Sequence, residues 1–165
     1  KVASPEERAE KIQTLGKEWA STDEPKVHEG FRESIETIHR VFGSPESIQA
    51  VDKDELIEGL MSVHAFYEQL RFTKGGAANL PLAFWEANSQ DLGKVKGIFE
   101  YLIHGPEDFI ERLHDILYDP ERKLGLFGRF CALELYGTLN PHDVPPMNGR
   151  MAKALRYLGF KVTVA

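Results

Sequence analysis

The sequence has one cysteine, Cys131, and this excludes two kinds of structural cross-link. A single thiol forms no disulfide within the chain and cannot supply the several cysteine ligands of a structural zinc site. No apolar run approaches the ~20 residues that a membrane-spanning helix requires, and no signal segment opens the chain. Cys131 lies in an apolar segment, so we expect a buried thiol in a cytoplasmic protein.

The sequence also lacks the motifs of common enzyme sites. It has no Gly-x-Ser-x-Gly elbow, no phosphate-binding loop ending in Gly-Lys-Ser/Thr and no dinucleotide fingerprint. We expect His39, His64 and His114 to be surface or partly buried helix residues, and His104 to cap the last turn of its own helix. We therefore predict no catalytic residue, no metal site and no cofactor.

Negative charge is unevenly distributed along the sequence. The net charge of −6 falls within residues 1–60, which hold 14 Asp and Glu against 8 Lys and Arg. No acidic residue follows Asp143, and a second acid-free window, residues 69–85, contains Arg71 and Lys74. This asymmetry permits a basic face on an acidic protein.

Signals for helix starts and ends occur along the whole sequence. Ser4-Pro5-Glu6-Glu7 is typical of a capped helix start, and Ser44-Pro45 begins another helix. Further helices are predicted over residues 52–70, through 95–102, from 106 onward and over 124–139. No clear run of alternating apolar residues predicts a β-sheet. We therefore predict an all-α fold, a single compact multi-helix domain over residues 1–165.

The segment Val144-Pro145-Pro146-Met147-Asn148-Gly149 is the most informative part of the chain. Asn148 is a favoured helix N-cap, and Gly159 is expected to end the helix that follows. One face of this helix carries an apolar stripe that we expect to be buried, formed by Met151, Ala154, Leu155 and Leu158.

Basic residues occupy the remaining surface of this helix. They are Arg150, Lys153 and Arg156. Together with the backbone N–H groups of the first turn and the helix dipole, they would favour a phosphate. The alternative is a capped surface helix whose cations only face water.

Two other segments are candidate contacts for an anion. In Phe127-Gly128-Arg129-Phe130, we expect Arg129 either to form a buried ion pair with Glu134 or to contact a phosphate. Arg71, with the loop Lys74-Gly75-Gly76, could grip a nucleic-acid strand from another side.

Several of these segments, in this order and spacing, resemble a known family. They are Phe84-Trp85 with Asn88, Tyr101-Leu102-Ile103-His104-Gly105, Phe127-Gly128-Arg129 with Glu134, Asn140-Pro141, Pro145-x-x-Asn148-Gly149-Arg150 and Ala154-Leu155-x-x-Leu158-Gly159. The set is similar to helical specificity domains of bacterial type IV restriction systems, and most similar to the sulfur-binding domain of phosphorothioate-DNA-dependent restriction endonucleases.

The resemblance implies binding to double-stranded DNA in which sulfur replaces one non-bridging phosphate oxygen. Aligned on Asn148, it places the sulfur-contacting proline at Pro145, with Val144 where the family has an aromatic residue. We expect Pro146 to supply the lost apolar area. The DNA contacts would then come from Arg71, Lys74, Gly75, Gly76, Arg129, Asn148, Gly149, Arg150 and Lys153.

Three interpretations of function stay open. The first is a DNA-recognition domain without catalysis of its own, in which residues 1–60 form an acidic helical part and residues 61–165 carry the binding surface. In this interpretation the chain is cut from a longer protein, and a nuclease or ATPase module lies outside it. The second is a protein-interaction or regulatory helical domain of a defence ATPase. The third is a small-molecule enzyme of unrecognised type.

Overall fold

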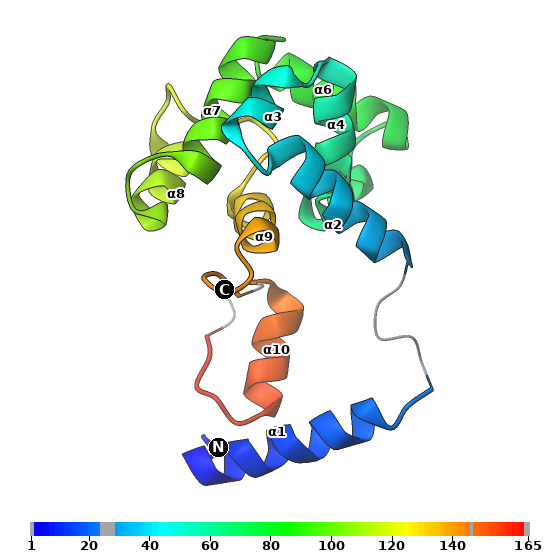
Figure 1. Cartoon of the computed structure of the whole chain (residues 1–165), viewed down its shortest axis with the longest axis vertical. Coiled ribbons are helices and arrows are strands. Elements are labelled where there is room, and N and C mark those ends of the chain that lie inside the picture. Colours follow the sequence, from blue (N-terminus) through cyan, green and yellow to red (C-terminus); the bar gives the residue numbers. More distant parts are fainter. Residues whose placement is uncertain (1, 24–28, 146, 164–165) are drawn as a thin grey trace. The chain divides into compact units, whose positions relative to one another are not determined.

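A computed structural model of the chain describes residues 2–23, 29–145 and 147–163, and these residues form helices and no strands (Figure 1). The predicted all-α class is therefore confirmed. The helices are α1 (Pro5–Ala20), α2 (Glu29–Phe42), α3 (Pro45–Ala50), α4 (Lys53–Met61), α5 (His64–Tyr67), the 3₁₀ helices η1 (Glu68–Phe72) and η2 (Gly76–Ala78), α6 (Asn79–Ala87), α7 (Leu92–His104), α8 (Phe109–Tyr118), α9 (Arg129–Leu139) and α10 (Gly149–Tyr157).

Contacts along the chain define two units. Residues 29–145 form one unit, which we call the core unit. The first and last described segments, residues 2–23 and 147–163, form the other, which we call the terminal unit. This division does not follow the change of charge near residue 60, because α1 is grouped with α10 rather than with the other acidic helices.

The core unit contains every fully buried apolar side chain among the described residues. Within it, α2 packs against α3, α4 and α9, and α7 packs against α8 (Figure 1). Phe99 lies at its centre, with its ring centroid 5.2 Å from that of Phe42 and 5.0 Å from that of Phe127. Aromatic contacts thus join α2 and α7 to the segment that precedes α9.

Two basic side chains of α7 bind the ends of other helices. The Lys96 ammonium, 8% exposed, donates to the carbonyl oxygen of Gln49 near the end of α3 (2.8 Å). His104 Nε2 lies 2.9 Å from the carbonyl oxygen of Phe42 at the end of α2, and it donates there because a carbonyl only accepts. Donors at helix C-termini satisfy orphan carbonyls, and the Lys96 ammonium also lies at the negative end of the helix dipole. His104 was expected to cap its own helix, but it caps α2 instead.

The predicted helix over residues 52–70 is broken into three pieces. Asp52 caps α4 as expected, with its carboxylate accepting from Glu55 N–H (2.9 Å). The chain leaves the helix at Met61, and α5 restarts because the Glu134 carboxylate of α9 accepts from Ala65 N–H (2.8 Å). A cap from a residue 69 positions away leaves no local signal in the sequence.

The helix predicted over residues 124–139 begins later, at Arg129. Gly125 N–H donates to the Asn88 side-chain oxygen (2.9 Å), and Leu126 has a left-handed φ of 58°. These contacts hold the segment outside a helix. The helix expected from Pro106 likewise begins at Phe109, where Asp108 accepts from Ile110 N–H (2.8 Å) as the N-cap.

Candidate nucleic-acid interface

The predicted C-terminal helix is present as α10, and both of its ends match the sequence signals. Asn148 Oδ1 accepts from Met151 N–H (2.9 Å). At the other end Gly159 has a φ of +90°, and Phe160 N–H donates to the carbonyl oxygen of Leu155 (3.0 Å). This is the Schellman arrangement that a C′ glycine allows. The helix is therefore fixed at both ends by its own sequence.

The apolar stripe of α10 is less buried than predicted. Met151, Leu155 and Leu158 are partly buried, whereas Ala154 is exposed. No residue of α1 or α10 is fully buried. The stripe was predicted to be buried, but it is only partly buried. The reason is that the terminal unit consists of two helices and their flanking turns, which cover little of the surface of α10.

Cation contacts connect α1 to the C-terminal end of α10. The Lys11 ammonium donates to the carbonyl oxygen of Tyr157 (2.6 Å) and lies 3.8 Å from the centre of the Tyr157 ring. Ala3 N–H donates to the carbonyl oxygen of Gly159 (2.9 Å). The Arg8 guanidinium lies over the Phe160 ring, 4.6 Å from its centre. Arg8 and Lys11, two of the basic residues of α1, therefore both contact residues within the terminal unit.

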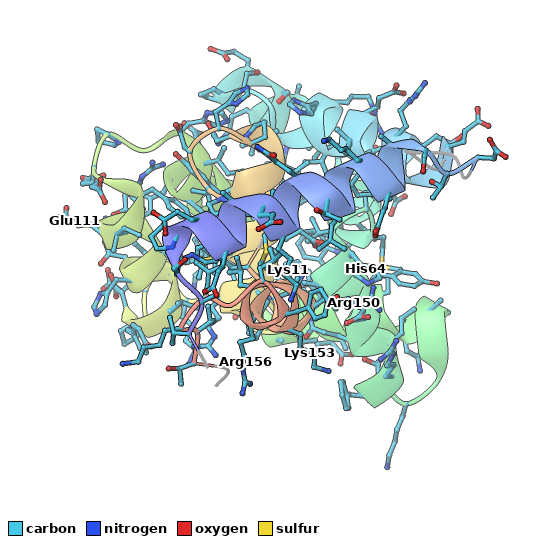
Figure 2. The ribbon with its side chains drawn as sticks, turned by 90° about the horizontal axis from the view of Figure 1, so that it is seen from below. Lys11, His64, Glu111, Arg150, Lys153 and Arg156 are labelled. Atoms are coloured by element: carbon cyan, nitrogen blue, oxygen red, sulfur yellow. The ribbon has the colours of Figure 1, made fainter. Side chains whose placement is uncertain are left out.

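The basic side chains of α10 differ from Arg8 and Lys11 in this respect. Arg150, Lys153 and Arg156 are exposed, and within the described part of the chain none of them has an ion-pair partner. Figure 2 shows Lys153 and Arg156 on the side of α10 that faces away from α1. Seven Lys and Arg against five Asp and Glu make the described terminal unit basic, although the whole chain carries −6.

The residues of the expected sulfur pocket have different environments. The Val144 side chain is partly buried against the core of its unit, whereas Pro145 is exposed. Pro146 lies outside the described residues. Met147, which the sequence analysis did not single out, is 54% exposed. It adds a soft, apolar thioether directly before the helix cap.

Arg71 of η1 and the turn Lys74-Gly75-Gly76 lie within a six-residue segment of the core unit, and all but the partly buried Gly76 are exposed. Gly75 and Gly76 have φ values of 92° and 71°, a backbone that favours glycine, and the Asn79 amide donates to the carbonyl oxygen of Lys74 (2.7 Å). The Arg71 guanidinium lies 3.4 Å from the Glu68 carboxylate. The structure brings these four residues together, and it places Asn148, Gly149, Arg150 and Lys153 in the other unit.

Arg129 does not form the ion pair that was one of its two predicted roles. It is exposed at the first turn of α9, with its guanidinium 4.8 Å from the centre of the Phe130 ring. The Glu134 carboxylate instead accepts from Ala65 N–H. Burial raises the pKa of Glu134, while the hydrogen bond from Ala65 opposes this rise. Arg129 is thus available to an external anion.

Two other titratable sites of the core unit have structural roles. Burial raises the pKa of Cys131 to about 12, which leaves an unreactive thiol. The Asp115 carboxylate accepts from Tyr101 Oη (2.7 Å) and from Arg122 (2.8 Å), and the hydrogen bond from Tyr101 is the main cause that lowers the pKa of Asp115. This cluster ties α8 to α7 and to the turn that follows α8.

Comparison with known proteins adds no assignment, since no family model, curated protein or solved structure matches this chain. No helix in the described ranges is long and apolar enough to cross a membrane. In the same ranges, no three His, Cys, Asp or Glu side chains are grouped so that they could hold a metal ion.

Proposed function

We propose that this chain binds double-stranded DNA through α10 and reads a phosphorothioate in the DNA backbone. The observation that supports the proposal is the set of three exposed cations on α10, which have no ion-pair partner among the described residues and follow an Asn-capped helix start. A phosphate near this start would meet backbone N–H groups, the positive end of the dipole and basic side chains together.

Discrimination between sulfur and oxygen would come from the residues before the cap. Pro145 and Met147 present apolar atoms, and Pro145 has no N–H to offer. Sulfur is larger and more weakly hydrated than oxygen, so it loses little when it is pressed against such a surface. An ordinary phosphate oxygen would lose water there without a new hydrogen bond, which costs several kcal/mol, on the order of 2–7.

One titration tests the proposal. We expect at least tenfold tighter binding to a duplex with one stereodefined phosphorothioate than to the matched ordinary duplex, which corresponds to about 1.4 kcal/mol. Fluorescence anisotropy at near-physiological salt measures both affinities. Equal affinities would remove the sulfur specificity, and no binding to either duplex would remove DNA binding.

Charge-removing variants test which unit meets the DNA. Lys153→Ala and Arg150→Ala should weaken binding to modified and ordinary DNA by similar factors, and each should reduce the salt slope by about 0.9. Lys94→Ala, a change at an exposed lysine of α7 that forms no ion pair within the described residues, is the matched control and should leave the slope unchanged. Equal effects of Lys153→Ala and Lys94→Ala would contradict a site on α10.

Pro145→Asp tests the apolar surface itself. This substitution introduces a carboxylate and a backbone N–H at an exposed position outside any helix. Modified DNA should bind much more weakly while the helical circular dichroism is retained. A folded Pro145→Asp variant that still prefers the phosphorothioate would place sulfur recognition elsewhere.

A second candidate function is protein interaction, as in a regulatory domain of a defence ATPase. It is favoured by exposed apolar side chains on α8, where Ile110 is 66% and Tyr118 69% exposed. Binding through apolar contacts would depend only weakly on salt, whereas DNA binding falls steeply with ionic strength. The same titration, repeated at two salt concentrations, therefore distinguishes the two functions.

A further inference from the structure

Arg112 of α8 is a buried cation without an anionic partner. Its side chain is 6% exposed, and no carboxylate lies within ion-pair distance of it in the described ranges. Its Nη1 donates to the carbonyl oxygens of Leu102 (2.7 Å) and Tyr101 (3.4 Å) at the end of α7. Its Nε is buried and has no hydrogen-bond partner. Native proteins rarely leave a buried donor unpaired, and a buried charge is normally neutralised.

Aromatic rings compensate only part of this charge. The guanidinium carbon lies 5.9 Å from the centre of the Phe109 ring and 5.6 Å from that of Tyr136. The two rings are stacked on each other, with centroids 3.7 Å apart. Ring faces and helix carbonyls attract a cation through partial charges, whereas an anion would supply a full one.

Arg112 lines an open cavity of about 450 Å³ in the core unit. Apolar atoms of Phe109, Ile110, Tyr136 and Val144 share the lining. The volume falls in the range of small-ligand pockets, which combine apolar walls with a few polar groups. The cavity therefore combines one buried positive group with an apolar part of its wall, and carboxylates form the rest of the lining.

Acidic residues at the same cavity limit the charge of the ligand. Glu107 and Asp143 are exposed and line the cavity, as does Asp108, whose carboxylate already caps α8. A phosphate dianion or a polyanion would meet repulsion from these side chains. A ligand with a single negative charge meets less of it and still reaches the guanidinium.

We infer that this cavity binds a small monocarboxylate with an apolar or aromatic body. The carboxylate pairs with the Arg112 guanidinium, and the apolar body lies against Ile110, Val144 and the stacked rings. A planar carboxylate matches the hydrogen-bonding edge of an arginine. This site uses no residue of α10, although Val144 in its wall is also part of the expected sulfur pocket.

The test uses three probes on the whole chain. They are N-acetyl-L-phenylalanine, its neutral amide N-acetyl-L-phenylalaninamide, and inorganic phosphate. In ¹H–¹⁵N NMR titrations we expect the carboxylate to shift the Arg112 Nε–H signal and to bind at least tenfold more tightly than the amide or phosphate. Equal binding of acid and amide, tighter binding of phosphate, or no binding of the acid would each overturn the inference.

Substitutions at Ile110 provide a readout that does not disturb the core. Because this side chain is 66% exposed, Ile110→Lys and Ile110→Glu should both fold. Ile110→Lys should strengthen binding of N-acetyl-L-phenylalanine severalfold, and Ile110→Glu should weaken it. Arg122→Gln, in the neighbouring surface pocket of α7 and α8, should have no effect. Loss of binding in Arg122→Gln, or equal affinities of the two Ile110 variants, would place the ligand elsewhere.

Discussion

The two units of this chain are stabilised in different ways and carry opposite charge. The core unit buries all of the fully buried apolar side chains, and its described residues hold 20 Asp and Glu against 11 Lys and Arg. The terminal unit buries no residue of its two helices and has more basic than acidic residues. Apolar burial is the main source of folding free energy, so the first unit supplies stability and the second supplies an accessible basic surface.

The largest expected effect is a core deletion. Phe99→Ala removes a fully buried ring that contacts Phe42 and Phe127, and it should lower the free energy of unfolding by about 3–5 kcal/mol. Leu155→Ala, on the partly buried face of α10, should cost about 1 kcal/mol or less. Urea denaturation measures both values. Equal losses would mean that the terminal unit contributes to stability as much as the core does.

A smaller effect is expected at the cap of α10. Asn148→Ala removes the acceptor for Met151 N–H and should destabilise this helix by about 1 kcal/mol. Hydrogen exchange of the α10 amides measures the change. The core unit should be unaffected, because Asn148 caps α10 of the other unit.

Asn148→Asp separates the role of residue 148 as a helix cap from its role next to a bound phosphate. Aspartate keeps the capping acceptor, so α10 should exchange as slowly as in the native protein, while the added negative charge should weaken DNA binding. A variant with both properties separates helix stability from anion binding. If Asn148→Asp bound DNA as tightly as the native chain, the start of α10 would not face the phosphates.

The smallest effect concerns pH. The raised pKa of Glu134 means that its proton is held more firmly in the folded state than in the unfolded state. The contribution of this group to the free energy of unfolding is therefore greatest below the ordinary glutamate value of 4.5 and falls as pH rises through the folded pKa.

Glu134→Gln should remove this decline in the free energy of unfolding with pH, while the Gln side-chain oxygen still accepts the hydrogen bond from Ala65 N–H. Urea denaturation between pH 4.5 and neutrality should then show a flatter profile for the variant than for the native chain. Glu100→Gln, a change at a partly buried carboxylate of α7 that accepts from the Gln49 amide, is the control. The same decline in the Glu134→Gln variant would assign the pH dependence to another group.

Local signals in the sequence predicted most of the helices and many of their ends, but not α6. Capping boxes at Ser4 and Asp52 and the Asn148 cap are contained within a few residues, so the chain itself specifies them. The breaks within residues 52–70 and 124–139 were missed, because Glu134 and Asn88 act from distant helices. Sequence alone cannot show which distant side chain will reach a given backbone group.

The same limit applies to the candidate site. The cap and the cations of α10 were predicted because their positions follow from helical spacing. The prediction of an ion pair between Arg129 and Glu134 was wrong. Spacing along a helix does not reveal that the Glu134 carboxylate accepts from the backbone of α5. The role of Arg112 was missed for a related reason, because its burial depends on how α8 packs against α7 and its cavity on how α8 packs against α9.

The hydrogen bond from Ala3 to Gly159 has a consequence for the order of events during synthesis. It joins the start of the described chain to the turn that ends α10. Helix α1 is translated before the core unit, and α10 is translated after it. Because a chain emerges at ≈ 5–20 residues per second, α1 waits for several seconds or longer without α10. The core unit can form during that delay, so the basic surface is completed after the core unit.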